Sequence, residues 1–192
     1  MKKILQSKVF LTTIATAWFL AVAIPIGYLM GFHQAFSNTT KANRLAEVVK
    51  DQRIVLHLIG ADCLCSDKLA NHLIKRLPLK NISEKIIVVG DNPGLEKKLA
   101  VAGFEVEKMS ADLAFTRYSI KALPQMIIFD SHKPVYSGGY SAKRSPASEE
   151  DYDDLRIIDQ FFKGTFSESR PIFGCANGAM LRSKIDPLKM KY

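Results

Sequence analysis

The stretch Arg53-Ile-Val-Leu-His-Leu-Ile-Gly-Ala-Asp-Cys-Leu-Cys-Ser66 joins an apolar run to two cysteines that lie one residue apart. The run from Arg53 to Ile59 is short and nearly continuous, which is typical of a strand covered on both faces. Residues 66–77 follow with leucines at four-residue spacing and a proline directly after them, and this pattern predicts a helix. Cys63 is therefore expected where a buried strand meets the start of a helix.

Strand and helix patterns continue to alternate along the rest of the chain. Buried strands are predicted at 85–90 and 125–130, and the segments between and after them carry shorter elements. These are helices at 95–102 and 110–118, strands at 104–108 and 134–137, and a last helix that begins at Ser148 and ends at Gly164. Alternation followed by a hairpin predicts an α/β domain with a mixed central sheet.

The N-terminal region is apolar enough to enter a membrane. From Val9 to Phe32 there is no charged residue, and a helix of that length spans a hydrocarbon core of about 30 Å. Lysines before the run favour a cytoplasmic N-terminus. A cleaved signal peptide is the alternative, but residues 31–37 make a poor cleavage site, so we expect an uncleaved anchor. The chain is then a single-pass inner-membrane protein with its soluble domain in the periplasm, where disulfides can form.

Composition and charge complete the expected organisation. The chain is 47% hydrophobic and 24% charged, which indicates a globular protein. Its net charge of +8 is scattered without a basic stripe, so no nucleic-acid partner is expected. The predicted parts are a cytoplasmic N-terminus (1–8), a transmembrane signal-anchor (9–32), a tether with an amphipathic helix (33–52), the α/β domain (53–164) and a tail (165–192).

The cysteines are the residues most suited to chemistry. Backbone N–H groups and the positive end of a helix dipole stabilise a thiolate at a position such as Cys63. Cysteines are often only small buried apolar residues, but two in one strand-to-helix turn favour redox or metal chemistry. A disulfide between Cys63 and Cys65 would close a very small ring, and distorted disulfides are easily reduced.

Two segments together resemble the thioredoxin-like superfamily. One is the cysteine motif at a helix start, and the other is Tyr118-Ser-Ile-Lys-Ala-Leu-Pro-Gln-Met-Ile-Ile-Phe-Asp130, followed by Val135-Tyr-Ser-Gly-Gly139. In that family a cis-proline precedes a strand and the next strand ends in glycine. The resemblance covers about 53–164. It implies a three-layer thioredoxin-like fold in which Pro124 is the cis-proline packed against the cysteine turn. The long interval between Cys63 and Pro124 is similar to the membrane-anchored TlpA-like branch.

A narrower resemblance includes the tail. Cys63-Leu-Cys-Ser66, Tyr136-Ser-Gly-Gly-Tyr140 and Arg170-Pro-Ile-Phe-Gly-Cys175 are similar to anchored proteins called RedB, which carry an early Cys-Pro-Cys and a late Phe-Gly-Cys. The chain departs from thioredoxin, whose motif is Cys-x-x-Cys, because Ser66 stands where the second cysteine would be. The resemblance therefore bears more on fold than on reaction.

Three further residues have candidate roles. By the resemblance, His57 stands where a buried acid often handles the proton of the resolving thiol. A histidine could do the same or ligate a soft metal, and the alternative is a core histidine satisfied by the backbone. Cys175 could be a structural partner of the cysteine turn, a resolving thiol or a third metal ligand. His72 is expected on the surface.

Three functions remain open from the sequence. The first is a thiol–disulfide oxidoreductase without a cofactor that acts on the thiols or disulfides of exported proteins. Cys63 would attack, Cys65 or Cys175 would resolve, Pro124 would shape the groove and His57 would handle a proton. The second is a chaperone that binds a copper ion or another soft metal, or a thiol donor for the assembly of a metalloprotein, with metal ligands drawn from Cys63, Cys65, His57 and Cys175. The third is a scaffold in which Cys175 forms only a structural disulfide with one of the other cysteines.

Overall fold

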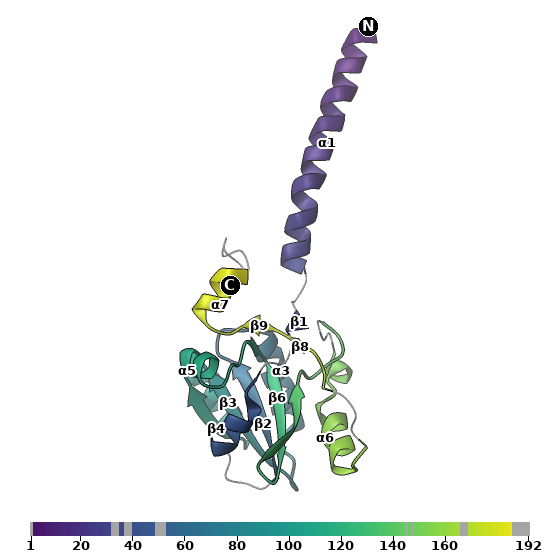
Figure 1. Cartoon of the computed structure of the whole chain (residues 1–192). Coiled ribbons are helices and arrows are strands. Elements are labelled where there is room, and N and C mark those ends of the chain that lie inside the picture. Colours follow the sequence, from purple (N-terminus) through teal and green to yellow (C-terminus); the bar gives the residue numbers. More distant parts are fainter. Residues whose placement is uncertain are drawn as a thin grey trace. The chain divides into compact units, whose positions relative to one another are not determined.

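The computed structural model describes residues 2–31, 35–36, 40–48, 53–144, 146, 148–165 and 169–185. The chain divides between Phe32 and His33 into two compact units, an N-terminal helix and an α/β domain (Figure 1). Of the predicted tether, the described part contains β1 (Ala35–Phe36), the short helix α2 (Ala42–Leu45) and the 3-10 turn η1 (Ala46–Val48). Residues 49–52, and most of the candidate cleavage site, lie outside the described ranges.

The N-terminal unit is the helix α1 (Lys2–Gly31). Its segment Lys8–Gly27 is long and apolar enough to cross a membrane, and α1 is the one such helix among the described residues. Large apolar side chains such as Trp18 and Phe19 are exposed along it. This arrangement suits a hydrocarbon environment, since exposed apolar residues in such number are rare on a soluble surface.

A five-stranded mixed sheet forms the centre of the α/β domain (Figure 1). The strand order is β4-β3-β2-β6-β7, where the strands are β2 (Arg53–Gly60), β3 (Ser83–Val89), β4 (Glu105–Met109), β6 (Gln125–Asp130) and β7 (Lys133–Gly138). β2 pairs in parallel with β3 and antiparallel with β6. The α/β class and the mixed sheet predicted from the sequence are confirmed.

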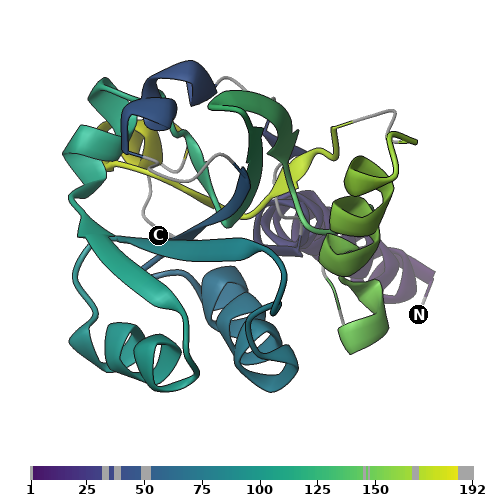
Figure 2. The same cartoon turned by 90° about the horizontal axis from the view of Figure 1, so that it is seen from below.

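Helices cover both faces of this sheet, which explains the continuous apolar runs of its central strands. Val55 and Ile59 of β2 share a core cluster with α3 (Leu64–Arg76), α4 (Pro93–Val101) and α6 (Asp154–Phe162). Leu56 and Leu58 point to the other face and pack with α2 and α5 (Ala111–Thr116). Figure 2 shows α3 and α4 on one side of the sheet and α2 and α5 on the other.

The last predicted helix does not run unbroken from Ser148. Ser148 and Asp151 form a capping box for the 3-10 turn η2 (Glu149–Asp151), and Tyr152 is then extended before α6 begins at Asp154. The break has a physical cause, because the N–H of Asp153 donates to the carbonyl oxygen of Tyr140 at 2.7 Å instead of to a helical neighbour. This hydrogen bond ties the start of α6 to the end of the hairpin.

The tail, whose sequence has little periodicity, packs on the domain through backbone pairing. β8 (Ile172–Phe173) pairs with β1, and β9 (Cys175–Ala176) pairs with β5 (Ala122–Leu123). Both pairings are antiparallel, and the short helix α7 (Ala179–Ile185) follows. The β5–β9 pairing brings Cys175 to the cysteine turn.

Candidate thiol site

Cys63 occupies the N-cap position of α3, with Ala61 and Asp62 between it and the end of β2, at the strand-to-helix junction that the sequence predicts. Its backbone is extended, and its carbonyl oxygen accepts a hydrogen bond from the N–H of Asp67 at 3.0 Å. Its sulfur is bonded to that of Cys175, 112 residues further on, with 6.0 Å between the two Cα atoms. Among the pairings left open by the sequence, the structure therefore has Cys63–Cys175 and not Cys63–Cys65.

Cys65 lies in the first turn of α3 and is half-buried, whereas Cys63 is only 3% exposed. The sulfur atoms of Cys63, Cys65 and Cys175 all lie within 4.8 Å of one another. We call these three residues the thiol cluster. Because the third sulfur is so close to the disulfide, intramolecular thiol–disulfide exchange requires only small movements.

Pro124 lies beside the thiol cluster. The peptide bond between Leu123 and Pro124 is cis, as the resemblance implied. The carbonyl oxygen of Leu123 is 3.6 Å from the sulfur of Cys63, and Leu123 is the direct partner of Cys175 in the β5–β9 register. The proline and the cysteines, distant in sequence, therefore form one site.

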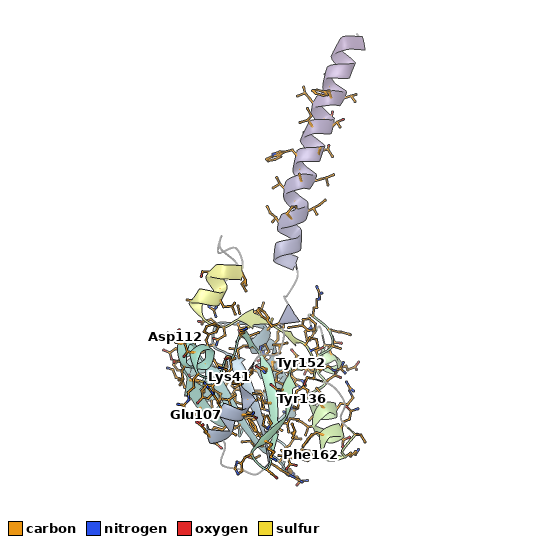
Figure 3. The ribbon with its side chains drawn as sticks, in the orientation of Figure 1. Lys41, Glu107, Asp112, Tyr136, Tyr152 and Phe162 are labelled. Carbon is orange, nitrogen blue, oxygen red and sulfur yellow. A yellow bond between two sulfur atoms is a disulfide. The ribbon has the colours of Figure 1, made fainter. Side chains whose placement is uncertain are left out.

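A surface groove opens next to this site. Its lining mixes apolar and basic side chains: Leu64, Cys65, Lys68, Pro124, Tyr140, Ser141, Lys143, Arg144, Pro146, Tyr152, Pro171 and Phe173. Tyr152, labelled in Figure 3, lies in the extended link between η2 and α6. Cys65 lines the groove, whereas Cys63 lies in the disulfide beneath the tail. An attacking Cys63 therefore requires that the disulfide first be opened.

Ser66, three residues after Cys63, has a structural role in the turn. Its buried hydroxyl accepts a hydrogen bond from the N–H of Gly60 at 2.9 Å. That bond joins the end of β2 to the first turn of α3 and fixes the cysteine turn between them. The serine hydroxyl thus provides a hydrogen bond to the backbone of the turn that a cysteine at this position would provide less well.

His57 is fully buried in β2, and both of its ring nitrogens are engaged. Nε2 lies 3.0 Å from a carboxylate oxygen of Glu84, and Nδ1 lies 2.8 Å from the hydroxyl of Tyr140. Tyr140 lines the groove, so His57 is connected to the site through that ring. The described residues that could ligate a metal near Cys63 are the three cysteines alone, and His57 is not brought among them.

A buried ion network continues from His57. Glu84 accepts hydrogen bonds from both terminal nitrogens of Arg76, at 2.6 and 3.1 Å, and one from the N–H of Leu79 at 2.6 Å. Arg76 also donates through Nε to Asp154 at 2.8 Å. Burial opposes ionisation of Glu84, but the hydrogen bonds from His57 and Arg76 outweigh it and lower its pKa to about 2. The carboxylate is therefore held ionised inside the protein.

The expectation that His72 lies on the surface was wrong, since His72 is 7% exposed and belongs to this network. Nε2 lies 3.0 Å from Asp154, Nδ1 lies 2.6 Å from Glu149, and the ring stacks on Tyr152. Two carboxylates as partners require both nitrogens to donate, which describes the protonated ring. Burial disfavours that charge, but the hydrogen bonds and charges of Asp154 and Glu149 raise the pKa of His72 above its ordinary value.

Sequence reasoning missed Glu84 and Asp154, which lie far from the cysteines along the chain. One signal was present, because His72 and Arg76 are four residues apart and so share a face of α3. Two cationic side chains on a helix face that packs against a sheet require buried acids opposite them. The sequence alone does not identify which acids these are.

The network predicts a stability maximum in weakly acidic solution. The pKa of Glu84 is lowered, so its ionised form contributes about 3 kcal/mol to the free energy of unfolding. This contribution is complete above pH 4.5 and is lost as the pH falls toward about 2. The pKa of His72 is raised, so its protonated form also stabilises the fold. This stabilisation is complete below pH 6.5 and is lost as the pH rises through the pKa of His72 in the folded protein. We expect the melting temperature, with respect to these groups, to be highest between pH 4.5 and 6.5, as measured by calorimetry.

The two limbs of that profile can be separated by substitution. Glu84→Gln is expected to make the acid limb shallower and to leave the alkaline limb in place. His72→Gln is expected to remove the alkaline limb and, because His72 helps to lower the pKa values of Asp154 and Glu149, to make the acid limb shallower as well. An alkaline limb that persists unchanged in His72→Gln would show that another group controls it.

Comparisons with known proteins leave the family open. No protein-family model and no curated protein matches this chain. A hypothetical protein from Sinorhizobium meliloti 1021 is similar in structure, with 17% identity, a TM-score of 0.45, and coverage of 76% of this chain and 93% of that one. An uncharacterized conserved protein from Geobacillus kaustophilus has 19% identity, a TM-score of 0.46, and coverage of 76% and 90%.

Proposed function

We propose that this chain is a membrane-anchored thiol–disulfide oxidoreductase of thioredoxin-like fold whose domain faces the periplasm. Its substrates are the thiols or disulfides of exported proteins. The observation that carries the proposal is the thiol cluster, in which a disulfide and a third cysteine meet at the start of α3 beside Pro124. The apolar helix α1 supports the membrane assignment, and a disulfide suits an oxidising compartment.

The proposed reaction is exchange through a mixed disulfide. In the reduced protein, the Cys63 thiolate attacks one sulfur of a substrate disulfide and releases the other as a thiolate. Cys65 or Cys175 then attacks the Cys63 sulfur, which releases the first substrate sulfur as a second thiolate that takes up a proton. Two electrons pass to the substrate and the protein retains a disulfide. The same steps in reverse oxidise a substrate dithiol.

The local structure favours Cys63 as the attacking group. Its sulfur lies at the N-terminus of a 13-residue helix, where N–H groups and the helix dipole stabilise negative charge. Lys68, one turn further along α3, lines the same groove and adds a positive charge. A stabilised thiolate is both available at neutral pH and a good leaving group when the disulfide is opened.

A redox titration tests whether the Cys63–Cys175 disulfide exchanges at all. The full-length protein in detergent is equilibrated with glutathione buffers and quenched with an alkylating agent, and the disulfide is quantified by mass spectrometry. Catalytic disulfides have potentials of about −270 to −120 mV, whereas structural ones lie below about −300 mV. We expect a value in the catalytic range. A disulfide that remains closed in the most reducing buffer would indicate a scaffold instead.

Binding of a copper ion is a second candidate, favoured by the three sulfurs within 4.8 Å of one another. Thiolates are the ligands that Cu(I) prefers, and after reduction all three cysteines become available. We expect reduced wild-type protein titrated with Cu(I) to bind one ion per chain if this function is correct. Cys65→Ser should then weaken binding at least about tenfold, by analogy with the loss of a metal-site contact. Equal affinity in the two proteins would exclude a site at the thiol cluster.

A further inference from the structure

Residues 170–177 lie on the domain as an extended peptide seated in the thiol site. β9 pairs antiparallel with β5, which ends directly before Pro124, and Cys175 is the partner of Leu123. Beyond this pairing, the backbone N–H of Asn177 donates to the carbonyl oxygen of Lys121 at 2.8 Å. The side-chain amide of Asn177 donates to the backbone carbonyl oxygen of Ile120 at 2.9 Å. The tail segment is therefore hydrogen-bonded along residues 120–123.

The residue before the cysteine must be glycine in this arrangement. A Cβ atom placed on Gly174 would lie 1.9 Å from the carbonyl oxygen of Leu123 and 2.6 Å from its carbon. Both are backbone atoms of the strand that pairs with the tail, so they cannot move aside without breaking the pairing. Any larger residue would lift the following cysteine away from Cys63.

The contact is equally close on the other side of the tail. A Cβ on Gly139 would lie 2.2 Å from the carbonyl oxygen of Pro171, so a glycine of the domain and a glycine of the tail both permit close approach of backbones. Pro171 and Phe173 meanwhile line the groove together with Cys65. The surface under the tail thus has an edge for backbone pairing and a limit on size before the cysteine. The groove beside it keeps apolar side chains of the domain, Leu64, Pro124 and Tyr152, when the tail is displaced.

We propose that this surface is a binding site for an extended polypeptide segment in which glycine immediately precedes the reactive cysteine. Residues 170–177 are its resident occupant, and an exported partner of the same Gly-Cys type replaces them after the Cys63–Cys175 disulfide is reduced. The inference rests on the proposed function and names the substrate class of that same site. A dithiol donor reduces the Cys63–Cys175 disulfide and is itself oxidised, and the partner cysteine enters as one half of a disulfide. The Cys63 thiolate attacks the sulfur of that cysteine, the other sulfur leaves as a thiolate that takes up a proton, and the mixed disulfide lies where Cys175 stood.

The test uses full-length Cys175→Ser protein in detergent, so that the resident segment is no longer covalently attached. It is mixed with the peptide Arg-Pro-Ile-Phe-Gly-Cys-Ala-Asn whose cysteine carries a thionitrobenzoate group through a disulfide. Attack by the Cys63 thiolate on the peptide sulfur breaks that disulfide and releases coloured thionitrobenzoate. A second peptide has alanine in place of the glycine, and reaction of both with free cysteine provides their intrinsic rates.

We expect the glycine peptide to react at least about tenfold faster than the alanine peptide, a difference of about 1.4 kcal/mol, because the added methyl group would overlap the backbone of Leu123. Equal rates would overturn the inference. The intact chain gives a second measurement. Because a larger residue at 174 moves Cys175 away from Cys63, Gly174→Ala should shift the equilibrium between the Cys63–Cys175 disulfide and glutathione toward the reduced protein at least about tenfold. The control is Gly94→Ala, because a Cβ at Gly94 meets only a side-chain oxygen at 3.6 Å. No difference between these variants would also overturn the inference.

Failure of the inference is distinguishable from failure of the proposed function. If the protein catalyses exchange but does not discriminate between the two peptides, the proposed oxidoreductase function stands and the proposed Gly-Cys preference is wrong. If the protein discriminates between the peptides but does not catalyse exchange, the binding surface stands and the proposed enzyme function is wrong.

Discussion

Replacing Cys63 with serine is expected to lower the rate of catalysed disulfide exchange at least about a hundredfold, because a serine hydroxyl does not ionise at neutral pH and cannot replace a thiolate nucleophile. Cys63 is also the cysteine at the helix N-terminus, where a thiolate is most stabilised. The measurement is the initial rate at which the full-length protein reduces a disulfide substrate in the presence of excess dithiol.

The matched control for this variant is Cys175→Ser. Both substitutions remove the same disulfide, so a loss of activity that came only from a weakened fold would appear equally in both. We expect Cys175→Ser to retain a measurable rate, since Cys63 and Cys65 remain. A Cys63→Ser protein that is as active as Cys175→Ser would assign the chemistry to Cys65.

Replacing Glu84 with alanine is expected to lower the free energy of unfolding by about 3–5 kcal/mol, the usual cost of removing one partner from a buried ion pair. The side chain of Glu84 is inaccessible to solvent, and its removal leaves the guanidinium of Arg76 facing a cavity. His57 and the N–H of Leu79 also lose their acceptor. The measurement is chemical unfolding of the full-length protein, followed by a spectroscopic signal of the domain.

Two further variants separate charge from position. Glu105 lies on the neighbouring strand β4 with its side chain exposed, and it shares its partner Lys85 with Glu107, so Glu105→Ala should cost less than about 1 kcal/mol. Glu84→Gln keeps the shape but removes the charge and should fall between the two. If Glu84→Ala were as mild as Glu105→Ala, the network would not contribute to stability as described.

Much of the domain could be predicted from the sequence because its strands are covered on both faces. The continuous apolar runs of β2, β3 and β6 need no knowledge of distant residues, and neither does the position of Cys63 after β2. The apolar segment of α1 is likewise a local property. Elements with strong local patterns were therefore predicted with nearly correct boundaries.

The rest depends on contacts between distant residues. The choice of Cys175 as the partner of Cys63 follows from the β5–β9 pairing, and β9 has only two residues, too few for a pattern. His72 appeared exposed because its acids, Asp154 and Glu149, come from a segment more than 70 residues later. The break before α6 likewise depends on a hydrogen bond to Tyr140.

The central claim, that Cys63 is the sulfur that attacks substrate, is tested most directly by trapping the mixed disulfide. The reduced Cys65→Ser/Cys175→Ser protein, which lacks both resolving thiols, is mixed with a disulfide-containing polypeptide, quenched with an alkylating agent, digested and mapped by mass spectrometry. The prediction is a stable substrate adduct on Cys63, which wild-type protein resolves and releases. Absence of that adduct, together with a substrate adduct on Cys65 in Cys63→Ser/Cys175→Ser protein, would contradict the claim.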